Sequence, residues 1–469
     1  MSPRARRGPG HPRGRCARGD GPAGRRGRRR RRRRGERGRR GRAVSAAPID
    51  RSLVPAGLWR LDAEALAAEF GTPLFVYDED AIRARARAYV AAFGPDAVVY
   101  AGKAFLCAAM VRLVAEEGLR LDVATGGELH VARHAGFPTD RIVLHGNNKS
   151  DDEIRAALDA GVGRIVADSH DEIDRLERIG AETGVTPRVL VRVTPGVEAH
   201  THEYIETGTE ASKFGFTVTD GVARDAALRV AASPRLDLVG LHCHIGSQIY
   251  ALDSYARATR IVLTLVRDLH DRGVPVPECN LGGGLGARYL ADDPVLDVEA
   301  YARVLRDAVT TAATGVGVPV PRIMVEPGRS IVAGAAITLY RVGTVKVIPG
   351  IGTYVAVDGG MSDNPRPVLY GAGYEAYLPT RPDAPRDLAC AVVGKHCEQG
   401  DVVVADAHLP ADVAVGDLLA TPATGAYGYS MASTYNKVPR PAVVFVRSGV
   451  PRVVVRRETL DDLLRLDAG

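Results

Sequence analysis

Short runs of apolar, β-branched residues alternate with longer amphipathic segments between residues 98 and 328. The runs have strand length, and the segments between them show the spacing of apolar positions that is typical of helices on a core. The predicted strands are residues 98–104, 119–125, 142–146, 164–169, 188–193, 238–243, 279–284 and 322–328. The clearest predicted helices are residues 127–136, 150–161, 171–184 and 298–312. Eight strands with intervening helices predict a TIM-like (β/α)8 barrel over residues 77–335, in preference to an open doubly wound sheet.

The pattern changes from about residue 336, where strand-like runs follow one another without long helices. These runs are residues 338–348, 353–360, 387–395, 401–407, 417–423 and 442–457. They predict a separate antiparallel β-domain over residues 336–469, so the fold class is α/β plus β. Residues 46–76 are too few to fold alone, and we expect them to dock onto that β-domain.

The first part of the chain has a different charge from the rest. Residues 1–42 hold 19 arginines and two acidic residues, a net charge of +17, whereas the whole chain carries +6. The remainder therefore carries −11. Residues 1–45 lack apolar periodicity and are predicted to be a disordered tail. The tail could neutralise phosphates, but it has no aromatic residues for stacking on bases, so nucleic-acid binding is not favoured. It could also be upstream sequence read from a misplaced start codon.

The remaining composition is that of a soluble globular protein, with 45% hydrophobic and 25% charged residues in 469. No apolar run approaches the roughly 18 residues that span a bilayer, so a membrane protein is not expected. The six cysteines, at positions 16, 107, 243, 279, 390 and 397, show no paired spacing. This spacing favours a reducing cytoplasm over a disulfide scaffold or a zinc site.

A lysine interrupts the first barrel strand. In VVYAGKAFLC, residues 98–107, Lys103 stands between apolar residues. An ammonium group facing an apolar interior is costly unless it is paired, neutralised or covalently used. Alternatively, the amine reaches water along its own methylenes.

Lys103 is one of several reactive or glycine residues at the ends of the predicted strands, where barrel enzymes carry their active sites. They are Lys103, His145, Arg192, His244, Gly282, Gly283, Gly284 and Glu326. The three glycines let backbone N–H groups approach an anion, although a plain tight turn would also explain them. A lysine, a phosphate loop and a carboxylate together suit pyridoxal 5'-phosphate, which needs an amine for its carbonyl and an acid for its ring nitrogen. Apolar surroundings should then lower the pKa of Lys103.

Ten motifs in order carry a resemblance to a known family. They are YAGKAF, DVATGGEL, HGNNKS, SKFGF, GLHCHIGSQI, NLGGGLG, EPGRSIV, DGGMSDNPRP, GKHCEQGD and GAYGYSMAS. From about Leu53 to its end, the chain resembles the fold-type III, alanine-racemase-like decarboxylases, and within them the diaminopimelate decarboxylases. The resemblance implies a pyridoxal phosphate enzyme that converts meso-2,6-diaminopimelate to L-lysine and CO2.

The resemblance also implies residue roles. Lys103 would form the Schiff base, His244 would stack on the ring, and Glu326 would hold the ring nitrogen. The phosphate would be held by Ser247 and Gly282 to Gly284, with Tyr427 near the cofactor. The substrate's far end would be bound by Arg329, Arg366 and Tyr370. Cys397 and Glu398 would enter from the second subunit of a homodimer, and Cys397, or alternatively Lys103, would return the proton to Cα.

Each role has an alternative. One of His242 and His244, which face the same way on a strand, could be a core histidine. Arg329 and Arg366 could be structural ion pairs, and Cys397 a small buried hydrophobe. The rival functions are an ornithine, arginine or carboxynorspermidine decarboxylase and a non-catalytic cofactor-binding protein. A cationic substrate tail would call for a carboxylate in the pocket, whereas arginines suit a second carboxylate.

Overall fold

The computed structural model describes residues 47–197 and 212–468, which lie in one compact unit, Val44–Gly469. The tail predicted to be disordered lies outside the described residues. Among the helices of the described ranges, none has both the length and the apolar character to cross a bilayer.

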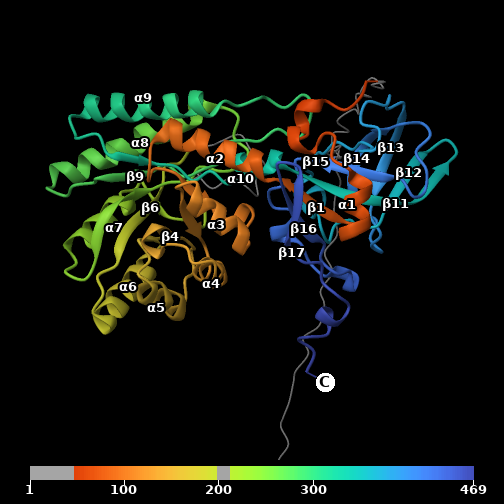
Figure 1. The fold of residues 1–469 in the computed structure, drawn as a ribbon. Helices are drawn as coiled ribbons and strands as arrows, with labels where there is room; N and C mark the ends of the chain where they lie inside the picture. The colour runs from red at the N-terminus through yellow and green to blue at the C-terminus, as the bar shows by residue number, and fades with distance from the viewer. Residues whose placement is uncertain (1–46, 198–211, 469) are drawn as a thin grey trace, which may run out of the picture. The chain divides into compact units, whose positions relative to one another are not determined.

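Eight parallel strands form the barrel (Figure 1). Their order in the sheet is β10-β9-β8-β6-β5-β4-β3-β2, and the short strand β7 (Phe216–Thr217) pairs with β6. A bridge between Val98 and Val325 joins the two ends of the sheet, where Val99 N donates to Val325 O at 2.8 Å. The predicted barrel is thereby confirmed. The strands are β2 (Val99–Ala101), β3 (Arg120–Val123), β4 (Ile142–Leu144), β5 (Arg164–Ala167), β6 (Arg188–Thr194), β8 (Asp237–His242), β9 (Glu278–Asn280) and β10 (Arg322–Met324).

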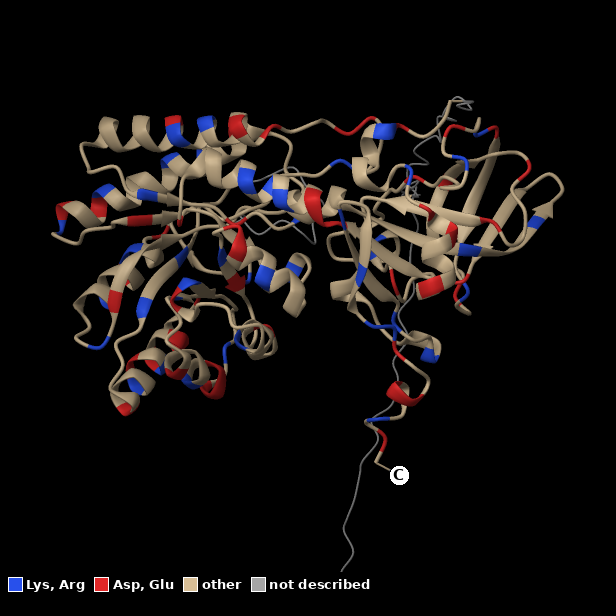
Figure 2. Cartoon of the chain, viewed as in Figure 1, with Lys and Arg blue, Asp and Glu red and all other residues tan. Residues whose placement is uncertain are grey.

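Helices surround the barrel strands (Figure 1). Helix α6 shows why they form, because it buries Ile173, Leu176 and Ile179 at a spacing of three and exposes Asp174 and Arg178. The main helices are α2 (Glu79–Phe93), α3 (Ala108–Glu116), α4 (Gly126–His134), α5 (Asp151–Ala160), α6 (His170–Thr183), α7 (Val222–Ala232), α8 (Leu252–Asp271) and α9 (Val298–Val316). Acidic and basic residues are interspersed along these helices (Figure 2). Exposed pairs of this kind contribute little to stability.

The barrel interior is filled rather than open. An apolar cluster drawn from six strands occupies its middle: Val99, Val143, Val166, Leu190, Val239 and Met324. At the amino-terminal end of the strands, Arg164 makes two contacts of 2.6 Å with Glu278. Both ends of this pair are buried, so this end of the barrel is closed by structural charges. The active site of such a barrel lies at the opposite end, where the strands have their carboxyl ends.

The second sheet contains strands from both ends of the chain. Its order is β14-β13-β12-β11-β1-β16-β17, and β15 pairs with β11. Most pairings are antiparallel, as predicted, but β1 pairs in parallel with β16 and β12 in parallel with β13. Helix α1 (Ala63–Phe70) packs in an apolar cluster with this sheet. The strands are β1 (Leu74–Asp78), β11 (Ala336–Ile348), β12 (Gly352–Val357), β13 (Leu388–Val393), β14 (Val402–Leu409), β15 (Leu418–Pro422), β16 (Ala442–Arg447) and β17 (Val450–Val455).

Candidate active site

Lys103 follows β2 in a 3-10 turn, Gly102–Ala104. Its neighbours Gly102, Ala104 and Phe105 are buried, but the lysine side chain is accessible from a pocket at the carboxyl ends of the strands. The expectation of an enclosed amine with a lowered pKa is therefore wrong. Desolvation lowers the pKa of Lys103, but nearby Tyr427, Asp122 and Glu326 outweigh it, and the pKa is raised.

One pocket brings together most of the predicted cofactor residues. Its lining includes Lys103, His244, Ser247, Gly284, Glu326, Arg329 and Tyr427. All but one of these residues follow barrel strands, and Tyr427 comes from the loop after β15, where its N–H donates to Ala104 O at 2.8 Å. The pocket therefore combines residues separated by more than 300 positions in the sequence.

The glycine loop after β9 packs too closely for any side chain. A Cβ on Gly282, Gly283 or Gly284 would lie 2.4, 2.0 or 2.2 Å from a backbone oxygen of Cys243, Glu326 or Gly246. Gly282 and Gly284 also have φ values of +69° and +103°, which disfavour other residues. Backbone of this kind can approach a phosphate closely.

His244 lies beside this loop as a neutral ring. Gly283 N donates to its Nδ1 at 3.2 Å, so the ring proton belongs on Nε2. Burial, with the charges of Lys103 and Arg192, holds the pKa of His244 well below its usual range. A neutral imidazole is suited to pack against an aromatic ring.

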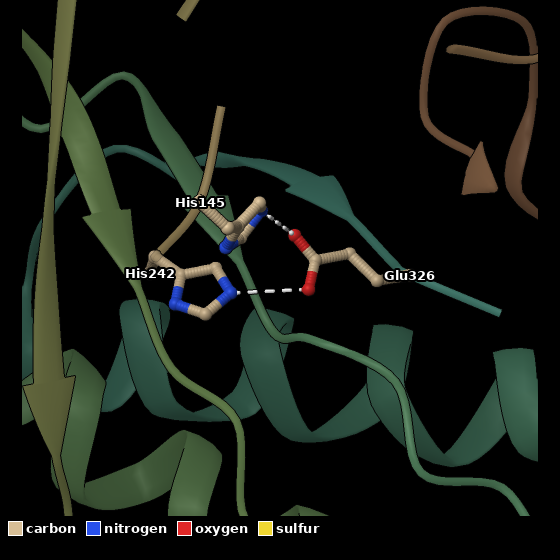
Figure 3. Close-up of side chains that lie close together, drawn as sticks. All are labelled: His145, His242 and Glu326. Carbon is tan, nitrogen blue, oxygen red and sulfur yellow. Dashed lines mark hydrogen bonds and ion pairs between the residues drawn. The ribbon is translucent and has the colours of Figure 1, made fainter. Parts of the chain in front are cut away.

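Glu326 is held by three side chains, of which Figure 3 shows the two histidines. Its Oε1 lies 2.9 Å from His145 Nε2 and accepts from Asn280 Nδ2 at 2.7 Å, and its Oε2 accepts from His242 Nε2 at 3.1 Å. Burial raises the pKa of Glu326, but the two histidines reverse that effect and lower it well below its ordinary value. The carboxylate is therefore ionised, as holding a proton on a ring nitrogen requires.

The two histidines differ in charge. Burial lowers the pKa of His242 to about 4, so this ring is neutral near pH 7. Burial also lowers the pKa of His145, but Asp122 and Glu326 raise it above its ordinary value. The two imidazoles against Glu326 therefore differ, since the surroundings favour the charged form of His145 and the neutral form of His242.

Sequence reasoning missed several of these contacts. His242, the last residue of β8, and His244, two residues further along the chain, both contact the site, so neither is only a core histidine, which was the alternative left open for one of them. Alternation along β8 was the available signal. Asn280 and Asp122 had no assigned role; a buried polar residue inside an apolar strand could have marked each of them.

Arg329 and Arg366 begin the short helices α10 (Arg329–Val332) and α11 (Arg366–Tyr370). Seven arginines are buried in the described ranges, and five of them pair with carboxylates: Arg83, Arg120, Arg164, Arg192 and Arg386. Arg329 and Arg366 have no carboxylate within ion-pair distance among the described residues. They are therefore not structural ion pairs of that part of the chain. Tyr370, half-buried at the end of α11, does not line the Lys103 pocket.

Cys397 and Glu398 lie in the loop between β13 and β14, also outside that pocket. Cys397 is exposed rather than buried, and Glu398 accepts a hydrogen bond from Tyr435. Asp401 anchors the loop, since its carboxylate accepts from Met361 N at 2.6 Å and from His396 N at 2.8 Å.

These residues fit pyridoxal phosphate. The tightly packed glycine loop suits its phosphate, the neutral ring of His244 suits its aromatic face, and ionised Glu326 suits its ring nitrogen. Fold and pocket together thus define a pyridoxal phosphate-dependent barrel enzyme. In agreement, residues 79–333 match the family model of the pyridoxal-dependent decarboxylase, pyridoxal binding domain.

Comparison with known proteins narrows the class. Diaminopimelate decarboxylase of Mycobacterium tuberculosis is 52% identical over 412 residues, covering 86% of this chain and 92% of that protein. The Bacillus subtilis enzyme of the same name is 49% identical, covering 87% and 94%. A diaminopimelate decarboxylase structure from M. jannaschii in complex with L-lysine matches with a TM-score of 0.81 and 34% identity, covering 87% and 94%. The chain belongs to the diaminopimelate decarboxylase family.

Proposed function

We infer that this chain uses pyridoxal phosphate to decarboxylate meso-2,6-diaminopimelate to L-lysine and CO2, the last step of lysine biosynthesis. The observation that carries this inference is the pairing of the cofactor pocket with two buried arginines, Arg329 and Arg366, that lack carboxylate partners in the described residues. The family's identity of about 50% over most of the chain supports the same reaction.

Pyridoxal phosphate, when bound, accepts the electrons that loss of CO2 leaves on the substrate. Lys103 would hold the cofactor through its amine, and the glycine loop with Ser247 would bind the phosphate. Glu326 would keep a proton on the ring nitrogen, because its carboxylate is ionised and buried. His244 would fix the plane of the ring.

Substrate choice follows from charge. Decarboxylases of ornithine or arginine must accept a cationic tail, for which a carboxylate is the suitable partner. Two buried guanidinium groups instead favour a second carboxylate on the substrate, as diaminopimelate has. A non-catalytic cofactor-binding protein would have no use for this second charge site.

Proton return and assembly are further parts of the proposal. Cys397, with Lys103 as the alternative, would donate the proton to Cα. Cys397 and Glu398 lie outside their own chain's pocket and would enter that of a second copy, so the active unit would be a homodimer. Tyr370 and Tyr427 would complete the substrate site. We place the enzyme in the cytoplasm, with a barrel over residues 77–335 and a β-domain over residues 336–469, onto which residues 46–76 dock.

The decisive experiment mixes purified protein, pyridoxal phosphate and meso-diaminopimelate, and measures CO2 and L-lysine together. Equal amounts of both products are expected, with little CO2 from ornithine. Lys103→Ala should abolish turnover, whereas the matched change of exposed Lys437→Ala should not. Cofactor binding without CO2 release would support the non-catalytic alternative, and faster release from ornithine would support the rival decarboxylase.

A further inference from the structure

Two buried tyrosines surround the guanidinium groups of Arg329 and Arg366. Tyr289 accepts a hydrogen bond from Arg329 Nη1 at 2.6 Å, and its ring centroid lies 4.6 Å from the Arg366 guanidinium carbon. Tyr374 accepts a hydrogen bond from Arg366 Nη1. The two rings meet edge to face, with centroids 5.4 Å apart at 88°. Tyr289 thus contacts both arginines, and Tyr374 contacts Tyr289 and Arg366.

This arrangement leaves the positive charge of the arginines in place. A carboxylate partner would neutralise each guanidinium, as Glu278 does for Arg164 at 2.6 Å. Phenol groups supply acceptor oxygens and the negative faces of their rings, but no net charge. Burial raises the pKa of Tyr374 to about 12, so this tyrosine stays neutral at physiological pH.

The remaining donors of the two arginines are directed differently. Arg329 uses Nη2 and Nε on Ser247 Oγ, at 2.9 and 3.2 Å, which ties it to the cofactor pocket. Arg366 has one hydrogen bond in the described part of the chain, to Tyr374. An arginine has five N–H donors in a planar fork that matches a carboxylate. Most of the Arg366 fork is therefore available to an anionic ligand.

We propose that Tyr289 and Tyr374 are positioning residues that orient Arg329 and Arg366 toward the substrate's distal carboxylate and thereby set selectivity for that group. The proposal rests on the proposed function and extends it, because neither tyrosine was assigned a role from the sequence. Tyr289 has the larger effect, since it is the residue that contacts both guanidinium groups.

The test uses two ligands that differ by one carboxylate, L-lysine and cadaverine. Their dissociation constants are measured by calorimetry on the cofactor-loaded protein for wild type, Tyr289→Phe and Tyr374→Phe. Phenylalanine keeps the ring and removes the hydroxyl. Tyr377→Phe is the matched control, because its buried hydroxyl has no hydrogen-bond partner among the described residues.

Tyr289→Phe should weaken L-lysine binding about tenfold, as expected for loss of a hydrogen bond to a charged group, and leave cadaverine binding unchanged. Tyr374→Phe should act in the same direction, and Tyr377→Phe should do neither. The affinity for pyridoxal phosphate should stay within about twofold of wild type in all three, and KM for meso-diaminopimelate should rise more than kcat falls.

The proposal would be overturned if the variants bound L-lysine and cadaverine more weakly by the same factor, or if L-lysine binding did not change. A merely structural role predicts that the effect does not depend on the ligand's carboxylate. Loss of cofactor affinity in both tyrosine variants would also overturn the proposal. Calorimetry also separates this proposal from the proposed function. Suppose that wild type released no CO2 from meso-diaminopimelate, but that Tyr289→Phe still weakened the binding of L-lysine and not that of cadaverine. Only the proposed reaction would then fail.

Discussion

The charge of Glu326 can be removed with little change of shape by Glu326→Gln. The amide keeps an oxygen that can accept from Asn280 Nδ2, at 2.7 Å in the native protein, and it still fills the space between His145 and His242. What it loses is the anion that would hold a proton on the cofactor's ring nitrogen. Cofactor binding through Lys103 and the glycine loop should therefore survive while turnover falls.

The size of the effect follows from burial. Glu326 is buried, and both its oxygens contact histidine nitrogens within 3.1 Å. Removing one partner of a desolvated charge pair typically costs about 2 to 5 kcal/mol. At about 1.4 kcal/mol per decade, this predicts a fall in kcat of roughly 30-fold to several thousand-fold.

The assay measures kcat and the pyridoxal phosphate dissociation constant in parallel. Glu278→Gln is the matched control, since Glu278 is a buried glutamate at the opposite end of the strands, paired with Arg164. It should lower the unfolding temperature and leave kcat nearly unchanged. If cofactor-loaded Glu326→Gln kept kcat within threefold of wild type, the assigned role of Glu326 would be wrong.

Three further outcomes are expected. Arg366→Ala should lower kcat/KM for meso-diaminopimelate roughly 30-fold to several thousand-fold with cofactor affinity intact, and a change below threefold would contradict the substrate assignment. Because burial lowers the pKa of His242 from 6.5 to about 4, the unfolded state binds the extra proton between these values. The free energy of unfolding should therefore decrease by up to about 3 kcal/mol as pH falls through this window. Chemical denaturation at several pH values should give a shallower dependence of this free energy on pH for His242→Gln than for wild type. Equal slopes would count against the lowered pKa of His242. Asp401→Asn should reduce kcat about tenfold by loosening the Cys397 loop, with the absorbance of bound cofactor unchanged; full activity would show that the anchor is dispensable.

The barrel could be predicted because its signals are local. Apolar runs and turn residues lie next to one another in the chain, and all eight runs contain observed strand residues. The ends of the strands were predicted less accurately. The run at 279–284 was expected to be a strand throughout, but β9 ends at Asn280 because Gly282 adopts a positive φ. In the run at 98–104, strand β2 ends at Ala101, and Lys103 lies on the turn that follows.

The second sheet shows where local signals end. Strand β1 lies between β11 and β16, its partners more than 250 residues away along the chain. The sequence indicated that the N-terminal segment docks there, but a strand's pairing partner depends on distant residues. The same limit explains the parallel pairing of β12 with β13, since both strands show an ordinary apolar pattern.

In the site, residue types were easier to predict than electrostatics. Strand-end positions marked Lys103 and Glu326, and the resemblance added the roles of Arg329 and Arg366, but the pKa of Lys103 depends on the balance of burial against Asp122, Tyr427 and Glu326. No local pattern contains that balance. Likewise, Tyr289 and Tyr374 are 85 positions apart, and their joint contact with Arg366 arises only from the folded chain.

Asn280 links the two ends of the cofactor site through one side chain. Its Nδ2 donates to Glu326 Oε1 at 2.7 Å, and its Oδ1 accepts from Gly282 N at 3.0 Å. Strands β9 and β10 are hydrogen-bonded neighbours, with Asn280 opposite Met324, so the separation between the glycine loop and Glu326 is fixed by sheet register. A rigid cofactor needs its phosphate and its ring nitrogen held at a fixed separation. The closed barrel supplies that separation from backbone geometry, and the choice of amino-acid substrate would then fall to the segments outside the barrel strands that carry Arg366 and Cys397.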